Sequence, residues 1–230
     1  MLFGKRGGTD PGRTGDADAV CSTIRSACRK LGSAATQEEL GTQLAGIILR
    51  YSPSDIAHLN RNFATNVKDM DPAYRDRLSA KISEYLLGTW QRVRLMQQQG
   101  AFARLSGPVP GSNAEYWEMT AGTCCRARTG RDARLRFLKY LLAGFCMFVL
   151  REPAHPAGTP FPGGDTVELI DGIYFCPVRE RSGDVDAALC PFCPALQTPE
   201  IGYLKPPTGK NRNRQQEFIE DCYTHHHFNG

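Results

Sequence analysis

A long amphipathic segment after Asp71 and Pro72 constrains the fold of this chain more than any other feature. Aspartate followed by proline is typical of a helix start, because aspartate caps the first free amides and proline suits the first helical position. Apolar side chains then recur at steps of three and four residues: Tyr74, Leu78, Ile82, Tyr85, Leu86, Trp90, Val93 and Met96. This stripe follows one face for about seven turns. We therefore expect a long helix packed along its whole length.

Similar signals predict further helices on both sides of this segment. The clearest is a capping box, Thr36 with Glu39 three residues later, in which each side chain bonds a free amide at the helix start. The expected helices span residues 17–31, 37–51, 52–67, 113–125 and 129–151. Together with the long helix they predict a mainly α protein with a bundle-like helical body over 17–151.

The most apolar run of the chain covers residues 135–150 and contains Arg136 and Lys139. A helix that crosses a membrane needs about 20 apolar residues. This run is shorter and carries two charges, so we expect the central buried helix of the body. No membrane partner is predicted.

Residues 1–16 are rich in glycine and charged residues and have little to bury, which predicts a disordered tail. They lack the apolar stretch of a secretory signal peptide. A cytoplasmic location is therefore expected. In that reducing compartment clustered cysteines indicate metal binding or catalysis more often than disulfides.

The character of the sequence changes at residue 152. Residues 151–165 contain four prolines and three glycines, which favour a stiff loop. Asp171–Gly172 then separates two β-favouring runs, and this predicts a hairpin that pairs Ile170 with Ile173. A short helix over 211–223 follows near the end. Residues 152–230 are thus expected to form a loop, a hairpin, a cysteine knuckle and a C-terminal helix packed on the body.

Three cysteines in this second part have the spacing of a metal site. Cys190 and Cys193 form a C-x-x-C knuckle, and Cys176 lies at the open end of the predicted hairpin. Closed tetrahedral zinc needs a fourth ligand, for which His155 between rigid prolines is preferred. The other candidates are Cys222, His225, His226 and His227. The site would hold zinc or an iron–sulfur cluster, with a structural or accessory role.

Other functions of the same residues remain open from the sequence. Three ligands with an open position suit a catalytic metal, and Cys-Pro-Phe-Cys is similar to a glutaredoxin dithiol with Cys190 as nucleophile. Whether the protein is an enzyme is therefore undecided. Alternatively the three thiols are buried and inert, which is the reading preferred for the remaining cysteines: Cys21, Cys28, Cys124, Cys125 and Cys146.

Basic residues gather in two places. One group surrounds the start of the 129–151 helix, and the other lies in the late loop: Arg126, Arg128, Arg131, Arg134, Arg136 and Lys139, then Lys205, Lys210, Arg212 and Arg214. Aromatic residues are not interleaved with them, and the net charge is only +4. A module that binds nucleic acid or protein through these basic loops is therefore the second alternative function, with nucleic acid as the less expected partner.

Three stretches carry a resemblance to a known family: EPAHPAGTPFPGG (152–164), DGIYFCPVRE (171–180) and ALCPFCPAL (188–196). They resemble the family of methanogenic archaea named domain of unknown function twenty-one fifteen, or uncharacterised protein family three-zero-five. The resemblance covers most of the chain from about residue 35. It implies a cytoplasmic protein without an assigned activity, in which His155, Cys176, Cys190 and Cys193 belong to the shared motifs. The anaerobic lineage favours iron over zinc by association.

Overall fold

The computed structural model describes residues 15–161, 164–180 and 189–199. The α-helices in this part are α1 (Gly15–Gly32), α2 (Gln37–Ile48), α3 (Pro53–Asn66), α4 (Pro72–Gln98), α5 (Asn113–Cys124) and α6 (Gly130–Gly144). Short helical turns are η1 (Ala101–Arg104), η2 (Phe145–Leu150) and η3 (Cys190–Phe192), and the strands are β1 (Glu168–Ile170), β2 (Ile173–Cys176) and β3 (Leu196–Gln197). The predicted mainly α class is confirmed.

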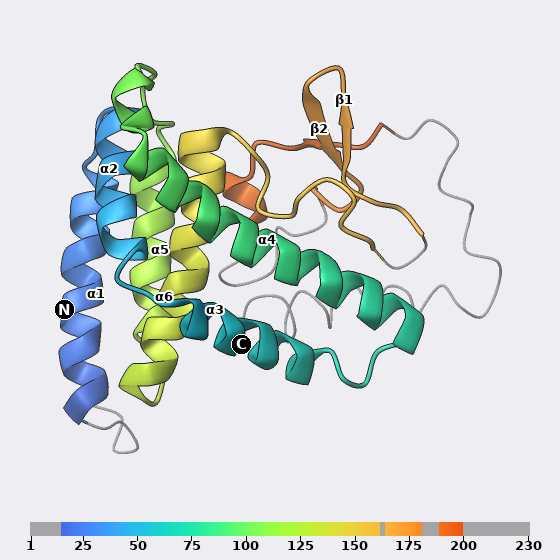
Figure 1. Ribbon diagram of the computed structural model, residues 1–230, viewed down its shortest axis with the longest axis horizontal. Coiled ribbons are helices and arrows are strands. Elements are labelled where there is room, and N and C mark those ends of the chain that lie inside the picture. Colours follow the sequence, from blue (N-terminus) through green and yellow to red (C-terminus); the bar gives the residue numbers. More distant parts are fainter. Residues whose placement is uncertain (1–14, 162–163, 181–188, 200–230) are drawn as a thin grey trace, which may run out of the picture.

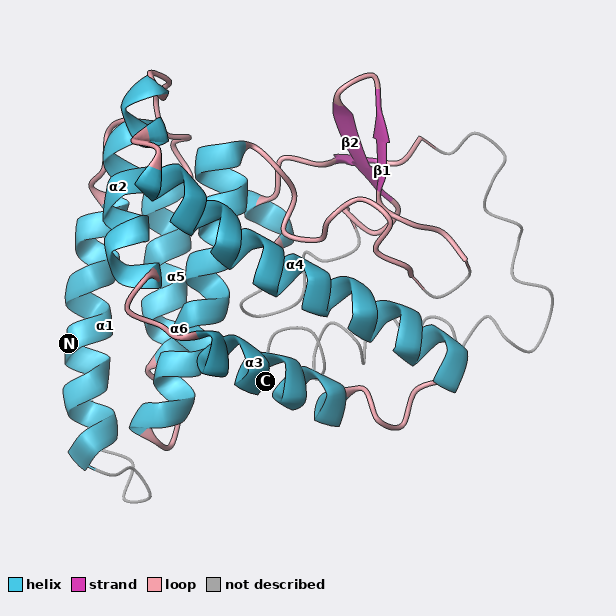
Figure 2. Ribbon diagram, viewed as in Figure 1, coloured by secondary structure: helices cyan, strands magenta, loops and turns pink. Residues whose placement is uncertain are grey.

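The helices form two groups. In Figure 1, α1, α2, α5 and α6 stand side by side, and α1 contacts both α5 and α6. Helices α3 and α4 contact each other and extend away from this group. The small sheet lies on the side of α4 opposite α3, as the secondary-structure colouring in Figure 2 makes plain.

The helix starts follow the predicted caps. The side chain of Thr36 accepts a hydrogen bond from the amide of Glu39, and that of Asp71 accepts one from the amide of Tyr74. Ser52 forms a complete capping box with Asp55. Before α6, two helix boundaries differ from the prediction by more than one residue. Helix α2 ends at Ile48 rather than at residue 51, and α1 begins at Gly15, inside the range predicted as a tail; residues 1–14 lie outside the described part.

Helix α6 and η2 form the centre of the core, as the apolar run predicted. From Leu135 to Val149 almost every side chain is buried, and Tyr140, Phe145 and Phe148 are enclosed almost completely. The predicted single helix over 129–151 is wrong in one respect, because Phe145–Leu150 form a π-helical segment. Arg151 then ends the helix in the left-handed conformation, at φ 59°. Within the described residues no helix is both long and apolar enough to cross a membrane.

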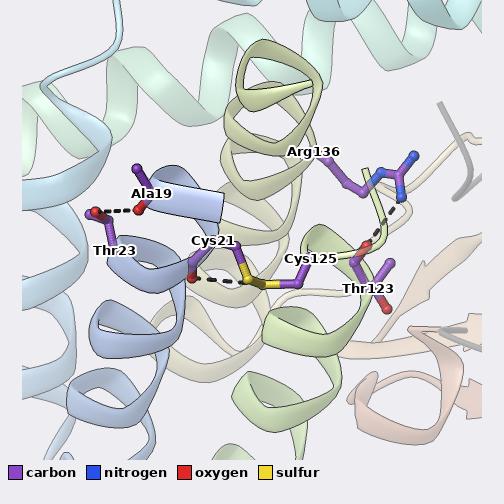
Figure 3. Close-up of a disulfide and its surroundings, with 6 residues drawn as sticks. All are labelled: Ala19, Cys21, Thr23, Thr123, Cys125 and Arg136. Carbon is purple, nitrogen blue, oxygen red and sulfur yellow. Dashed lines mark hydrogen bonds between the residues drawn. A yellow bond between two sulfur atoms is a disulfide. The ribbon is translucent and has the colours of Figure 1, made fainter. Parts of the chain in front are cut away.

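A disulfide joins α1 to the residue that follows α5 and corrects the expectation for two cysteines. Cys21 and Cys125 are buried as predicted, but their sulfurs are bonded to each other (Figure 3). Cys28, Cys124 and Cys146 are buried free thiols. Burial raises the pKa of Cys124 to about 12, and that of Cys146 to about 11, so neither forms a thiolate readily.

The close contact at Gly144 gives a stability test. A Cβ there would lie 2.9 Å from the Trp117 ring, so Gly144→Ala should lower the free energy of unfolding by about 1–3 kcal/mol through overpacking. Gly122→Ala is the matched control: its Cβ meets no atom within 4 Å, and helix propensity should make it neutral or stabilising by up to about 1 kcal/mol. Urea unfolding measures both, and equal effects of the two variants would contradict the packing described.

The disulfide gives a second test. It closes a loop with a sequence separation of 104, and removing it in Cys21→Ala with Cys125→Ala should cost about 2–5 kcal/mol. A reductant should lower the unfolding midpoint of the wild-type protein and leave that of the double variant unchanged. Non-reducing peptide mapping that found Cys21 and Cys125 as free thiols would contradict this pairing.

Candidate functional site

The hairpin places Cys176 at the end of a strand, as predicted. Strands β1 and β2 pair antiparallel with Ile170 opposite Ile173. The turn residues Asp171 and Gly172 have φ of 50° and 80°, the left-handed values that a two-residue hairpin turn requires. Cys176 closes β2 with a buried side chain, 5% exposed.

The C-P-F-C segment forms a tight turn, and an unpredicted strand holds it beside the hairpin. The amide of Cys193 donates to the carbonyl of Cys190 at 3.1 Å, which closes the turn η3. Strand β3 follows at once and pairs parallel to β2, with Leu196 opposite Phe175. The ring of Phe192 packs edge-on against Tyr116 of α5, at 5.3 Å between centroids. The knuckle is therefore attached both to the sheet and to the helical core.

The proline-rich loop carries His155 into the interior. The loop begins at Glu152, whose carboxylate binds Arg92 of α4 at 2.6 and 2.9 Å. His155 is 8% exposed and contacts the ring of Phe161 edge-on. Removal from water lowers its pKa to about 4, so the imidazole is neutral at physiological pH. A neutral imidazole is the form that binds a metal.

All four predicted ligands line one small cavity. Its volume is about 10 Å³, close to the space that one water molecule needs. The described residues that line it are Pro153, Ala154, His155, Val167, Cys176, Arg179, Leu189, Cys190 and Cys193. Three separate pieces of the chain (the loop, the hairpin end and the knuckle) therefore meet around a space of atomic size.

Backbone amides point at two of the sulfurs. Cys176 accepts a hydrogen bond from the amide of Val178, and Cys193 accepts bonds from the amides of Ala195 and Ala154. These bonds and the nearby Arg179 favour the thiolate. Burial nevertheless dominates: it raises the pKa of Cys176 to about 11 and that of Cys193 above its usual value. Without a bound cation both are thiols at neutral pH.

The four predicted ligands lie close together in this cavity, but their side chains do not form a coordination sphere. In the described part of the chain, no three or more His, Cys, Asp or Glu side chains have an arrangement that could hold a metal ion. The alternative ligands Cys222, His225, His226 and His227 lie outside the described residues, as does the predicted helix over 211–223.

Two residues of this site were not predicted from the sequence. Arg179 lines the cavity and donates from Nε to the carbonyl of Ala195, which ties the hairpin end to the residues after the knuckle. Phe192 is the apolar anchor of the knuckle. The signal for both was present in the sequence, because each lies within three residues of a predicted ligand.

Fold and site together define a mainly helical protein that carries a cysteine–histidine cluster between a hairpin and a knuckle. The family described as "Uncharacterized protein conserved in archaea (DUF2115)" matches residues 36–198, and the chain belongs to this family. The match includes His155 and the three clustered cysteines. Helix α1, which the disulfide joins to the residue that follows α5, precedes the matched region.

Several proteins of methanogenic archaea are similar to parts of this chain and carry the family name UPF0305. A UPF0305 protein of Methanopyrus kandleri is 44% identical over 61 residues, which are 26% of this chain and 43% of the relative. One of Methanothermobacter thermautotrophicus is 52% identical over 52 residues, 23% of this chain and 34% of the relative. The chain thus covers less than half the length of these two.

A UPF0305 protein of Methanocaldococcus jannaschii matches over a longer region, with 20% identity over 163 residues, 71% of this chain and 97% of the relative. No solved structure matches the chain.

The anchor of the knuckle can be tested by truncation. Phe192→Ala removes the contact with Tyr116 and should lower the free energy of unfolding by about 1–3 kcal/mol, less than for a fully buried ring because Phe192 is half-buried. Leu196→Ala, four residues later and 54% exposed, should change it by no more than about 0.5 kcal/mol. Denaturant unfolding compares them. A Phe192 variant as stable as the Leu196 variant would show that the knuckle is not fixed to the core.

Proposed function

We propose that this protein binds a single metal ion through Cys176, Cys190, Cys193 and His155, with zinc as the first candidate, and that the ion has a structural role in a cytoplasmic protein. The observation that carries the proposal is the common cavity of these four side chains. Three sulfurs and one imidazole nitrogen are a standard ligand set for structural zinc.

The surroundings of the sulfurs support a thiolate site. Three backbone amides donate to Cys176 and Cys193, and such bonds stabilise a negatively charged sulfur more than a neutral thiol. Three thiolates and one divalent cation leave one negative charge, which Arg179 at the cavity wall offsets. Because a buried thiolate needs a positive partner, a cation in the cavity resolves the cost that burial imposes on these residues.

The size of the cavity favours one ion over an iron–sulfur cluster. A cluster places several iron and sulfide atoms between its ligands. A space of about 10 Å³ suits one atom. Binding requires the side chains to adjust, since the described rotamers do not form a coordination sphere.

A structural role follows from what the site joins. The hairpin has two short strands and leaves Leu169, Ile170 and Ile173 exposed, so it buries little apolar surface of its own. An ion would tie the hairpin, the knuckle and the proline-rich loop together, and its binding energy would become folding energy.

The dithiol alternative has less support. Cys190 is only 4% exposed, whereas a redox nucleophile must be reached by its substrate.

Metal analysis of anaerobically purified full-length protein tests the proposal. We expect about one zinc per chain and a colourless protein. Cys176→Ser, Cys190→Ser and Cys193→Ser should each weaken zinc binding, measured by competition with a chromogenic chelator, by more than the roughly 10- to 100-fold typical of a supporting residue. His155→Gln should weaken it as well.

Cys146→Ser is the matched control, because Cys146 is also a buried free thiol but lies outside the cavity. It should bind zinc like the wild-type protein. Protein without bound metal, or variants that all retain it equally, would refute the proposed site. Iron with visible absorption would replace the single ion by a cluster.

A further inference from the structure

A second and much larger cavity lies between α3, α4 and α6. Its volume is about 480 Å³, within the range of about 300–1,000 Å³ that is typical of small-molecule sites. Leu59 and Phe63 of α3, Ile82 and Leu86 of α4 and Leu135 of α6 give it apolar walls. A cavity of this kind suits the hydrocarbon part of an organic ligand.

Among the described residues that line the same cavity, four are cations and one is an acid. They are Arg126, Arg128, Arg136 and Lys139, and the acid is Asp132. Asp132 already accepts a hydrogen bond from the hydroxyl of Thr129 at 2.6 Å, and its position three residues into α6 serves the helix start. The basic group noted in the sequence is thus divided: Arg131 and Arg134 are absent from this lining, while the other four surround an apolar space.

Arg136, which lines this cavity, has one side-chain donor that makes no hydrogen bond to a described residue. One of its terminal nitrogens donates to the carbonyl of Thr123 at 3.1 Å, the bond drawn in Figure 3. Its Nε is buried and has no hydrogen-bond partner in the described part of the chain. A buried donor of this kind costs free energy unless an acceptor reaches it.

Lys139 lies close to Arg136 in the same cavity wall. Removal from water and the neighbouring Arg136 lower the pKa of Lys139 to about 7, so the cavity disfavours the accumulated positive charge. Arg136 and Lys139 thus give the cavity a basic wall, to which a negative group of a ligand can bind.

We propose that this cavity binds a small organic anion, consisting of an apolar body and one carboxylate or phosphate group. The apolar body lies against the leucine, isoleucine and phenylalanine walls, and the anionic group binds Arg136 and Lys139. The proposal is independent of the metal ion. The two cavities nevertheless share a wall made by Ala154, His155 and Leu189, so the bound anion lies beside the sulfur site.

The test uses 8-anilinonaphthalene-1-sulfonate, an aromatic body with one anionic group, as a fluorescent probe of the full-length folded protein. We expect saturable binding at one site. Decanoate and decyl phosphate should displace the probe, and their relative strengths distinguish a carboxylate from a phosphate ligand. Decanol and inorganic phosphate at the same concentrations should displace it at least about tenfold less well, because each lacks one half of the recognised chemistry.

Variants connect the binding to this cavity. Arg136→Gln and Lys139→Gln should each weaken probe binding about tenfold or more, as expected for the loss of a charged hydrogen-bond donor. Arg134→Gln is the matched control on the same helix. Its side chain lies over the ring of Tyr51, outside the cavity, and it should bind the probe like the wild-type protein.

Near-ultraviolet circular dichroism confirms that each variant is folded. If Arg136→Gln or Lys139→Gln unfolds the protein, Arg126→Gln replaces it, since Arg126 lines the cavity with an exposed side chain and should also weaken binding. Absence of probe binding, displacement by decanol as strong as by decanoate, or unchanged affinity in the cavity variants would each overturn the proposal. None of these results depends on whether zinc binds.

Discussion

The ring of Tyr116 is the contact on which the arrangement of core and site depends. It is fully buried, and edge-on contacts join it to Trp117, Tyr140, Phe148 and Phe192 at centroid distances of 4.8 to 6.3 Å. Its buried hydroxyl donates a hydrogen bond to the carbonyl of Tyr140 at 2.6 Å. Such aromatic pairs each add about 0.5–1.5 kcal/mol beyond the burial of their surface. One side chain of α5 therefore positions α6, η2 and the knuckle together.

This arrangement explains how short, irregular segments form a site at all. The hairpin and the knuckle are too small to fold separately, but Cys176, Leu189 and Cys190 belong to the same apolar core as α6. The core fixes where the sulfurs lie, and the proposed ion would fix their orientation. The proposed anion cavity adjoins this site across His155. The imidazole thus stands between a small sulfur-lined space and a large space of mixed apolar and basic character.

The sequence predicted those features that depend on local chemistry. The caps at Thr36, Ser52 and Asp71 and the Asp171–Gly172 turn act over three or four residues, so their effect is visible in the sequence itself. The grouping of His155 with the three cysteines followed from spacing and from the family resemblance.

The features that the sequence did not predict depend on tertiary contacts. Strand β3 is only two residues long and exists because β2 offers it a free edge. The pairing of Cys21 with Cys125 depends on how α1 lies on α5, across a separation of 104. The cavity proposed to bind an anion forms only when α3, α4 and α6 are packed together, and only then do Arg136 and Lys139 differ from the solvent-facing Arg131 and Arg134.

X-ray absorption at the zinc edge of the metal-loaded, full-length protein tests the central claim most directly. The account predicts a four-coordinate ion with three sulfurs at about 2.3 Å and one nitrogen at about 2.0–2.1 Å. A spectrum without sulfur, with only nitrogen and oxygen around the zinc, would place the ion elsewhere in the protein and contradict the account.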